Sequence, residues 1–420
     1  MSTPSDRVTA VLDGLPGIRR WQEDLYRDIH QHPELSHQEH RTAGLVAERL
    51  QSNGFEVRRG IGGTGVVGIL RNGDGPGVLM RADMDALPVE EKTDLSYASS
   101  TRATDNAGND VPVMHACGHD VHVTCLLGAA TLLANATEQW NGTAIALFQP
   151  AEEVGDGARG MVDDGLANIL PPVDVALAQH VAPLPAGRIA ARLGPVLAAA
   201  DSMRITVYGR GSHGSMPQAS VDPVVLAAMI VIRLQTIVSR EVAPTDTVVL
   251  TIGSIHGGNK SNVISDRAVL ELNLRTYDQA TRTTVLDAIR RVVVGECQAS
   301  GSPRDPEFDL YDSFPPTVND HATTDRVTGA FAQHFGDRFA ILPTAATASE
   351  DFSEIPDALG APYTYWAFGG IDGQRFTQAV ESGSVNQDIP VNHSPLFAPV
   401  VQPTLDAGTE ALVVAALAWL

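Results

Sequence analysis

One short stretch of the chain, residues 115–122, gathers side chains that bind metal ions. It holds Cys117 together with His115, His119 and His122, in a chain of 420 residues with only 3 cysteines and 13 histidines. Thiolate and imidazole groups are the usual protein ligands of zinc and related metals. A structural role is the alternative, because a free cysteine packs like a small apolar residue. Taken alone, the stretch leaves both interpretations open.

Three apolar segments that we expect to be buried β-strands each end at polar side chains. They are residues 78–81 before Asp83 and Asp85, residues 143–148 before Glu152 and Glu153, and residues 172–179 before His180. Acidic residues in loops are more often turn formers than catalysts. Ligands of open α/β sheets, however, lie beyond the carboxyl ends of the strands. The recurrence at three strand ends therefore favours one shared site, to which a later loop adds His393.

The candidate side chains together indicate more than one metal ion. They are Cys117, His119, Glu152, Glu153, His180 and His393. A single catalytic zinc ion takes three protein ligands and keeps one position open for water. Five ligands and a spare carboxylate are better suited to two neighbouring ions, which can act on the attacking and the leaving side of a displacement. The sequence therefore predicts a dinuclear hydrolase.

The adjacent carboxylates Glu152 and Glu153 need different roles, because a carboxylate that coordinates a metal is a poor proton acceptor. One division of the roles makes Glu153 a ligand and Glu152 the general base, which takes a proton from the attacking water and passes it to the leaving amine. Metal ions lower the pKa of bound water to about 7, which makes a nucleophile available at neutral pH.

The elements that must position these residues divide the chain into two domains, as its length also suggests. We expect an α/β catalytic domain with a mostly parallel central sheet, formed by residues 1–196 and 314–420. Proline and glycine residues mark the crossings into and out of an inserted domain, residues 197–313. Its expected strands are 202–208, 247–255, 267–277 and 307–311, and its expected helices are 221–239 and 281–299. This βαββαβ order is that of a ferredoxin-like fold.

Helical periodicity in the catalytic domain predicts helices at residues 21–30, 42–53, 123–134, 322–335 and 398–420. Cys117 and His119 would then lie at or before the start of the third of these. The loop between the first two contains His32, Glu34, His37 and His40. We interpret His37 and His40 as solvated loop residues and leave the roles of His32 and Glu34 open.

Residues 60–65 match the dinucleotide-binding pattern GxGxxG. A true dinucleotide site follows a strand and opens a helix. Here the pattern is followed by another apolar strand, residues 66–70, and by a glycine-rich turn. We therefore predict a β-hairpin and no nucleotide.

The composition of the chain argues against several classes of binding partner. The 50 acidic and 29 basic residues give a net charge of −21, which opposes nucleic acids and anionic membranes. The longest apolar runs, 224–232 and 411–420, are shorter than the ~20 residues of a membrane span. Three cysteines form no disulfide framework and fit a reducing compartment. We expect a cytoplasmic protein that acts on a small molecule.

Four motifs resemble those of the dinuclear metallo-amidohydrolases and peptidases that include aminoacylase, carboxypeptidase G, hippurate hydrolase and the plant auxin-conjugate hydrolases. They are RADMDALP at 81–88, HACGHD at 115–120, PAEE at 150–153 and NHSP at 392–395. The resemblance is strongest to the hippurate and auxin-conjugate branch. It implies two divalent ions held by Cys117, His119, Glu153, His180 and His393, with Glu152 as the base. Zinc or manganese suits this set best, and cobalt or nickel is also compatible.

The resemblance also assigns roles outside the ligand set. The inserted domain would be a lid that forms a homodimer, and His213 would reach a neighbouring active site and stabilise the oxyanion. Asn262 and Arg275 would bind the substrate, Arg275 through a bidentate contact to a carboxylate. Asp85 would orient a ligand from outside the coordination sphere. One departure is Ser265, where the family usually has proline.

The resulting expectation is hydrolysis of the amide bond of N-acyl or N-aroyl amino acids, which yields a carboxylic acid and an amino acid. Within the cluster at residues 115–122, His115 and His122 are expected to have supporting roles. A dipeptidase or carboxypeptidase of the same family is the alternative enzyme. A metal-binding or ligand-binding protein without catalysis is a third possibility, against which the presence of Glu152 and His213 argues.

Overall fold

The computed structural model describes residues 4–420, and the chain in it separates into two units. The first contains the chain up to Gly194, Asn319–Thr344 and Asp351–Leu420. The second contains Pro195–Val318, and the short segment Ala345–Glu350 returns to it after the first unit has resumed. Each unit has its own cluster of buried apolar side chains.

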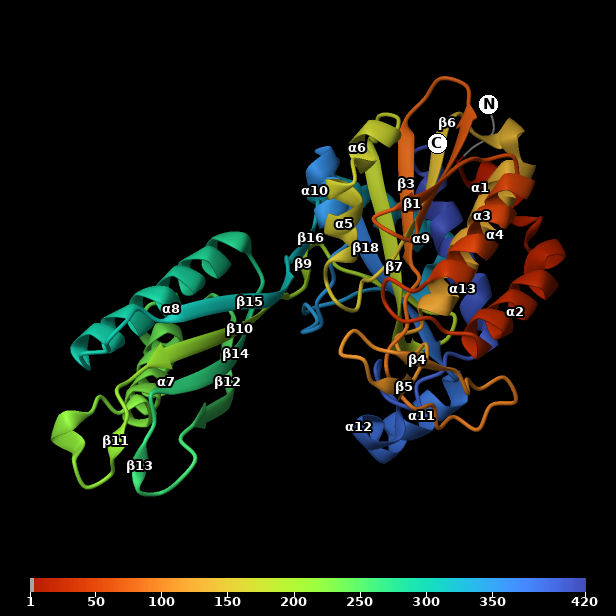
Figure 1. Cartoon of the computed structure of the whole chain (residues 1–420). Helices are drawn as coiled ribbons and strands as arrows, with labels where there is room; N and C mark the ends of the chain where they lie inside the picture. The colour runs from red at the N-terminus through yellow and green to blue at the C-terminus, as the bar shows by residue number, and fades with distance from the viewer. Residues whose placement is uncertain (1–3) are drawn as a thin grey trace. The chain divides into compact units, whose positions relative to one another are not determined.

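The first unit is built on a mixed sheet in the strand order β1-β2-β6-β3-β7-β18-β8-β17 (Figure 1). These strands are β1 Glu56–Ile61, β2 Gly65–Asn72, β3 Gly77–Asp83, β6 Gly142–Gln149, β7 Val175–Pro185, β8 Ile189–Ala191, β17 Phe339–Ile341 and β18 Tyr363–Ile371. The central strands β6, β3, β7 and β18 are parallel to one another. Because both of their faces are covered, these strands are mostly apolar. The predicted α/β fold with a mostly parallel central sheet is confirmed.

Helices cover both faces of this sheet (Figure 1). One face carries α1 Pro4–Leu12, α2 Leu15–Gln31, α3 His40–Ser52, α4 His119–Asn135, α9 His321–Phe335 and α13 Val401–Leu417, and the other carries α5 Gly157–Asp163, α6 Leu166–Ile169 and α10 Glu354–Leu359. Helix α4 is buried along almost its whole length, because it packs between the sheet and helices α2 and α13. This explains why its sequence is apolar on all sides.

Shorter elements complete the first unit. They are β4 Arg102–Thr104, β5 Asp110–Pro112, α11 Gly373–Ser382, α12 Val385–Asp388, and the 3-10 helices η1 Thr137–Gln139 and η3 Gly336–Arg338; β9 Gly194–Leu197 and β16 Thr317–Asn319 lie where the chain passes between the units. Strands β4 and β5 pair as a hairpin.

Two local predictions have different outcomes. The GxGxxG pattern is a hairpin, as predicted, because β1 and β2 pair antiparallel with Ile61 opposite Gly65. The strand expected at 172–179 was placed too early. Strand β7 continues to Pro185 because β18 pairs beside it, with Ala367 opposite His180. His180 therefore lies within a strand and not in the loop after it.

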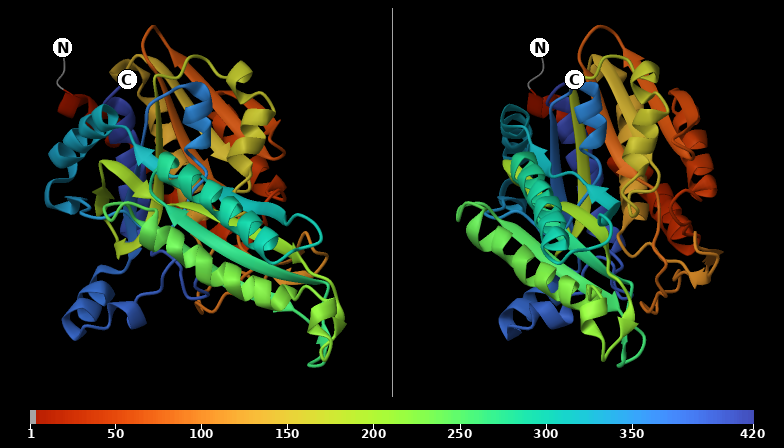
Figure 2. Two further views of the ribbon diagram at one scale, coloured as in Figure 1. Left: turned by 90° about the vertical axis from the view of Figure 1, so that its left-hand side faces the viewer. Right: turned by 60° about the vertical axis from the view of Figure 1, so that its left-hand side comes forward.

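The second unit is a four-stranded antiparallel sheet in the order β12-β14-β10-β15, with two helices on one face (Figure 2). Its elements are β10 Ala199–Tyr208, α7 Pro223–Arg240, β12 Val248–Gly257, β14 Arg267–Thr276, α8 Gln279–Ala299 and β15 Glu307–Phe314, with β11 Ser212–His213, η2 Pro217–Ala219 and β13 Val263–Ile264 in the connections. The predicted βαββαβ order is confirmed. Strand β12 is an edge strand, and among residues 4–420 it pairs with β14 alone.

Candidate metal centre

The sheet of the first unit brings the predicted ligands together. Strands β6, β3 and β7 are neighbours, so the loops after β6 and β3 and the side chain of His180 meet at one edge of the sheet. Cys117 and His119 reach the same place from the start of α4, and His393 reaches it from the last loop. Two groups of three ligand atoms result, Cys117–His119–His180 and Cys117–Glu153–His393, each within 4.8 Å.

The sulfur of Cys117 is common to both groups. It lies 3.4 Å from His180 Nε2, while His393 Nε2 lies 3.3 Å from Glu153 Oε2. Each of two centres would thus have three ligands, with one side chain shared between them. This arrangement suits a pair of close metal ions. This sharing was not part of the sequence prediction.

The backbone at the start of α4 lets Cys117 and His119 face the same point. Between them, Gly118 has the left-handed φ of 87°, and a Cβ there would lie only 2.4 Å from Val181 Cγ1. His393 also has a positive φ, 70°, which is unfavourable for a residue with a side chain. Its N–H donates to the carbonyl of Ala116, which helps to hold this conformation.

Two of the three candidate ligand histidines, His119 and His180, have their outer nitrogen fixed by the protein. His119 Nδ1 donates to Asp85 Oδ1 at 3.2 Å, and His180 Nδ1 donates to the carbonyl of Val181 at 2.8 Å. The Nε2 atoms are thereby turned toward the other ligands. Such bonds orient metal-binding imidazoles in known metal sites. Asp85 thus contacts a ligand in the way that its predicted role requires.

The inner atoms of the cluster fit divalent cations. His119 Nε2 and Glu153 Oε1 are buried without a hydrogen-bond partner among the described residues, and they lie 3.8 Å apart. Buried polar atoms are normally paired. A cation at each of the two ligand groups would pair both atoms, so the residues present fit the ions that the sequence predicts.

The electrostatics of the ligands agree with this fit. Burial raises the pKa of Cys117 well above its usual value, and burial raises the pKa of Glu153 to about 8 despite the nearby His119. Burial, followed by the neighbouring His122, lowers the pKa of His180. Without cations the acidic ligands therefore retain protons, and positive charge at the centre would favour their ionised, ligating forms.

Glu152 lies beside the cluster and is buried, with 6% of its surface exposed. Its Oε2 is 3.9 Å from His119 Nε2, so it reaches the same space as the ligands without belonging to either of the two groups that share Cys117. A carboxylate at this position is suited to handling a proton next to a metal centre.

The other two histidines of the cluster at residues 115–122 have different surroundings. His122 Nδ1 donates to Asp83 Oδ1 at 2.5 Å, and its Nε2 accepts from the N–H of Val181 at 2.8 Å. Both nitrogens are occupied, which leaves none for a metal ion. His115 is fully buried, and burial lowers its pKa to about 4, so it is neutral.

A buried polar network behind the site was missed by the sequence analysis. Arg81 donates to Asp83 Oδ2 at 2.6 Å, to Gln149 Oε1 at 2.9 Å and to Asp351 Oδ1 at 3.3 Å. Gln149 also donates to Asp351. The network ties the ends of β3 and β6 together and holds Asp83, the partner of His122. The available signal was an arginine within an otherwise apolar, fully buried strand.

The histidine-rich loop between α2 and α3 contributes no ligand. Glu34 accepts bonds from the N–H groups of Arg41 and Thr42, and so caps the start of α3. His37 pairs with Asp156 at 2.9 Å on the surface. The side chain of His32 is exposed, and its Nδ1 donates to a carbonyl of its own helix.

The predicted lid residues lie in the second unit. His213 is exposed in β11 and its Nδ1 is 2.7 Å from Ser215 Oγ, and Asn262 is exposed in the loop before β13. Arg275 in β14 donates from Nη1 to Ser349 Oγ at 2.6 Å and from Nε to Asn273 at 3.0 Å. Its guanidinium thus holds the returning segment Ala345–Glu350 against the sheet.

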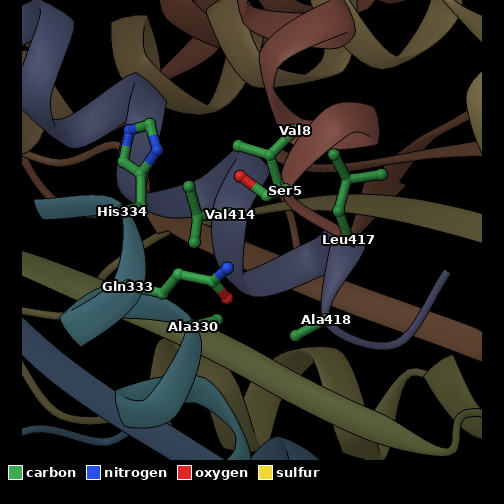
Figure 3. A pocket seen from close by; sticks show the side chains of 8 residues that line it. All are labelled: Ser5, Val8, Ala330, Gln333, His334, Val414, Leu417 and Ala418. Atoms are coloured by element: carbon green, nitrogen blue, oxygen red, sulfur yellow. The ribbon is translucent and has the colours of Figure 1, made fainter. Parts of the chain in front are cut away.

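A pocket elsewhere in the first unit lies between helices α1, α9 and α13 (Figure 3). It is lined by Ser5, Val8, Ala330, Gln333, His334, Val414, Leu417 and Ala418. None of these residues belongs to the predicted site, so the pocket is separate from the metal centre.

Comparison with known proteins agrees with the fold and with the family that the motifs resemble. The model of peptidase family M20/M25/M40 matches residues 79–386. Thermostable carboxypeptidase 1 of Saccharolobus solfataricus is 37% identical over 87% of this chain and 89% of its own length. Hippurate hydrolase of Campylobacter jejuni is 37% identical over 82% of this chain and 87% of its own length.

A solved structure gives the same result. A dinuclear metal-binding peptidase of the M20 family from Bacillus subtilis superposes with a TM-score of 0.76 at 28% identity, covering 96% of this chain and 98% of the other. The resemblance drawn from the four motifs is confirmed. The chain belongs to peptidase family M20/M25/M40 and is a hydrolase of amide or peptide bonds.

Proposed function

We propose that the protein is a dinuclear metal-dependent amidohydrolase that cleaves N-acyl or N-aroyl amino acids into a carboxylic acid and an amino acid. The observation that carries the proposal is the pair of three-ligand groups that share Cys117, with Glu152 buried beside them. The similarity to hippurate hydrolase supports the substrate class, because hippurate is an N-aroyl amino acid.

The residues of the chain then divide the reaction between them. Cys117, His119, Glu153, His180 and His393 hold the two ions, which when bound polarise the scissile carbonyl and acidify the attacking water. Glu152 accepts the proton of that water and delivers it to the amine that leaves. Asp85 and the carbonyl of Val181 keep the imidazoles of His119 and His180 in position. His213, Asn262 and Arg275 are proposed to contact the substrate and its oxyanion.

The chemical types of the ligand atoms limit which metal ions can bind. Thiolate and imidazole favour zinc, whereas the carboxylates also accept manganese. We therefore propose zinc or manganese as the native ions, with cobalt or nickel able to replace them. Elemental analysis of the purified protein distinguishes these cases.

A carboxypeptidase is the second candidate, favoured by the similarity to thermostable carboxypeptidase 1. The test is a substrate panel with metal-replete enzyme: acetyl-, benzoyl- and indoleacetyl-amino acids against dipeptides and longer peptides. We expect a higher kcat/KM for the acylated amino acids. A preference for peptides would favour the carboxypeptidase, and no hydrolysis of either group would contradict both enzymatic proposals.

We further propose that the second unit forms a homodimer. Helix α7 buries one side against its own sheet, while its opposite side exposes large apolar residues: Val224, Val225, Met229 and Ile232. Beside it, the edge strand β12 exposes Val249 and Ile255, and its outer backbone groups are open to another strand. A second copy of this unit presents the same edge and the same apolar side, so both can pair around a twofold axis.

Helix α7 also has the length and the mean hydropathy, 1.5, of a membrane span, and it is the one helix among residues 4–420 that passes this test of length and composition. A dimer accounts for the same apolar residues, since a third of the helix is already buried against its own sheet. Measuring the mass in solution and binding to lipid vesicles separates the two explanations. We expect twice the chain mass and no binding to vesicles.

A further inference from the structure

Glu39, at the start of α3, is completely buried although it lies in a loop region of mostly polar residues. Burying a carboxylate is costly unless it is well paired. Three donors surround it. The N–H of His37 and the N–H of Ala151 donate to Oε1 at 2.9 and 2.8 Å, and the hydroxyl of Thr64 donates to Oε2 at 2.6 Å.

The bond to Ala151 links this carboxylate to the turn that carries the two adjacent glutamates. Ala151 precedes Glu152 directly and has the left-handed φ of 52°, a conformation that residues with a side chain rarely adopt. Such a conformation persists only where surrounding groups hold it. Two carboxylates do so here, Glu39 at the N–H of Ala151 and Asp85 at the N–H of Glu153.

The turn is also compact. The N–H of Gly157 donates back to the carbonyl of Ala151, and a Cβ on Gly157 would lie 1.7 Å from the carbonyl oxygen of Pro150. A change in the Ala151 peptide would therefore be passed on to the next two residues, because the turn has little room to absorb it.

We propose that Glu39 is a positioning residue of the active site: its carboxylate holds the Ala151 peptide so that Glu152 and Glu153 point to their separate tasks. The inference rests on the proposed function for the roles of those two glutamates. Glu39 belongs to none of the candidate groups of metal ligands. It acts through the backbone of the turn, where a displacement of about 1 Å is enough to lower a rate by two orders of magnitude.

The test compares Glu39→Ala and Glu39→Gln with the wild-type holoenzyme on the best substrate of the panel. We expect Glu39→Ala to lower kcat about 10- to 100-fold with KM within about threefold, and to weaken metal binding about tenfold in a titration without substrate. Glu39→Gln keeps an acceptor for the Ala151 N–H and should stay within about threefold of the wild type in both measurements.

Glu34→Ala is the matched control. Glu34 lies on the same loop and also accepts three hydrogen bonds, but all of them come from Arg41 and Thr42 at the start of α3. This variant should lower the melting temperature and leave kcat unchanged. Equal losses of kcat in Glu34→Ala and Glu39→Ala would overturn the proposal, because the effect would then be general destabilisation.

A rescue variant tests the role of the left-handed turn itself. Glycine adopts positive φ freely, so Ala151→Gly added to Glu39→Ala should recover part of kcat. A double variant no more active than Glu39→Ala would count against the proposal.

A second variant serves if Glu39→Ala does not fold. Thr64→Val removes only the Thr64 hydroxyl that donates to Oε2 of Glu39, and it should lower kcat about two- to fivefold. An unchanged kcat would overturn the proposal. A wild type without hydrolysis would instead refute the proposed function.

Discussion

The two units distribute polar and apolar side chains in opposite ways. In the first, the charged residues Arg81, Asp83 and Asp351 are buried and bonded to one another behind the metal ligands. In the second, the buried residues are mostly apolar, and an exception is Asp201, which pairs with the partly buried Arg282. Yet most of the exposed large apolar side chains of the described residues lie in this smaller unit. Buried polar networks fix geometry, whereas exposed apolar surface indicates a partner, so the contrast matches chemistry in one unit and association in the other.

Removal of the Glu152 carboxylate tests the chemical role of the first unit, and we expect it to have the largest effect. We expect Glu152→Ala to lower kcat by about 10²- to 10⁴-fold, because proton transfer is lost, while the metal content stays unchanged. Glu138→Ala, which removes an exposed carboxylate of η1, should be indistinguishable from the wild type. Steady-state kinetics with elemental analysis makes the measurement, and full activity of Glu152→Ala would refute its assignment as the base.

Replacing Cys117 should affect metal binding more than any single change in the second unit. Since its sulfur is shared by both ligand groups, we expect Cys117→Ser to weaken binding of the ions by about 100-fold or more. Cys297→Ser, in α8, should leave metal affinity unchanged. Unaltered stoichiometry and activity in Cys117→Ser would contradict the shared-ligand assignment.

A charge on the exposed side of α7 tests whether the second unit serves in association. Ile232→Glu should convert the proposed dimer to a monomer, because it places a carboxylate in the proposed apolar contact. Gln235→Glu adds the same charge to the same helix at a position that is already polar, and should remain dimeric. Sedimentation equilibrium measures both variants. A dimer that persists in Ile232→Glu would move the interface away from α7.

The smallest expected effect concerns the stability of the first unit. Burial lowers the pKa of His30, but its bonds to Asp120 and Glu91 outweigh burial and raise that pKa to about 9. The folded pKa exceeds the unfolded value of about 6.5. The stabilisation is therefore complete below pH 6.5 and is lost as the pH rises through 9.

Thermal unfolding between pH 6 and pH 9.5 measures this dependence. At pH 6 the melting temperature of His30→Gln should lie about 5 °C below that of the wild type. The gap should narrow toward pH 9.5. A gap that stays constant with pH would show that His30 is not charged in the folded protein.

Much of the fold follows from local patterns. Helical periodicity located α2, α3 and α9, and the order of elements in the second unit was correct because each element carries its own pattern. Boundaries were less accurate. Strand β7 extends to Pro185 through its pairing with β18, a partner almost 200 residues away that no local pattern announces.

The candidate site likewise has features that the sequence predicts and features that depend on the fold. The sequence alone determined which residues have the chemistry of ligands and bases, because thiol, imidazole and carboxylate groups clustered in short motifs are visible without a fold. The tertiary structure alone decided that Cys117 is shared by two groups, that both nitrogens of His122 are occupied, and that Glu39 reaches the turn before Glu152. Those facts depend on contacts between segments that are distant in the sequence, and such contacts leave no trace in the type or spacing of side chains.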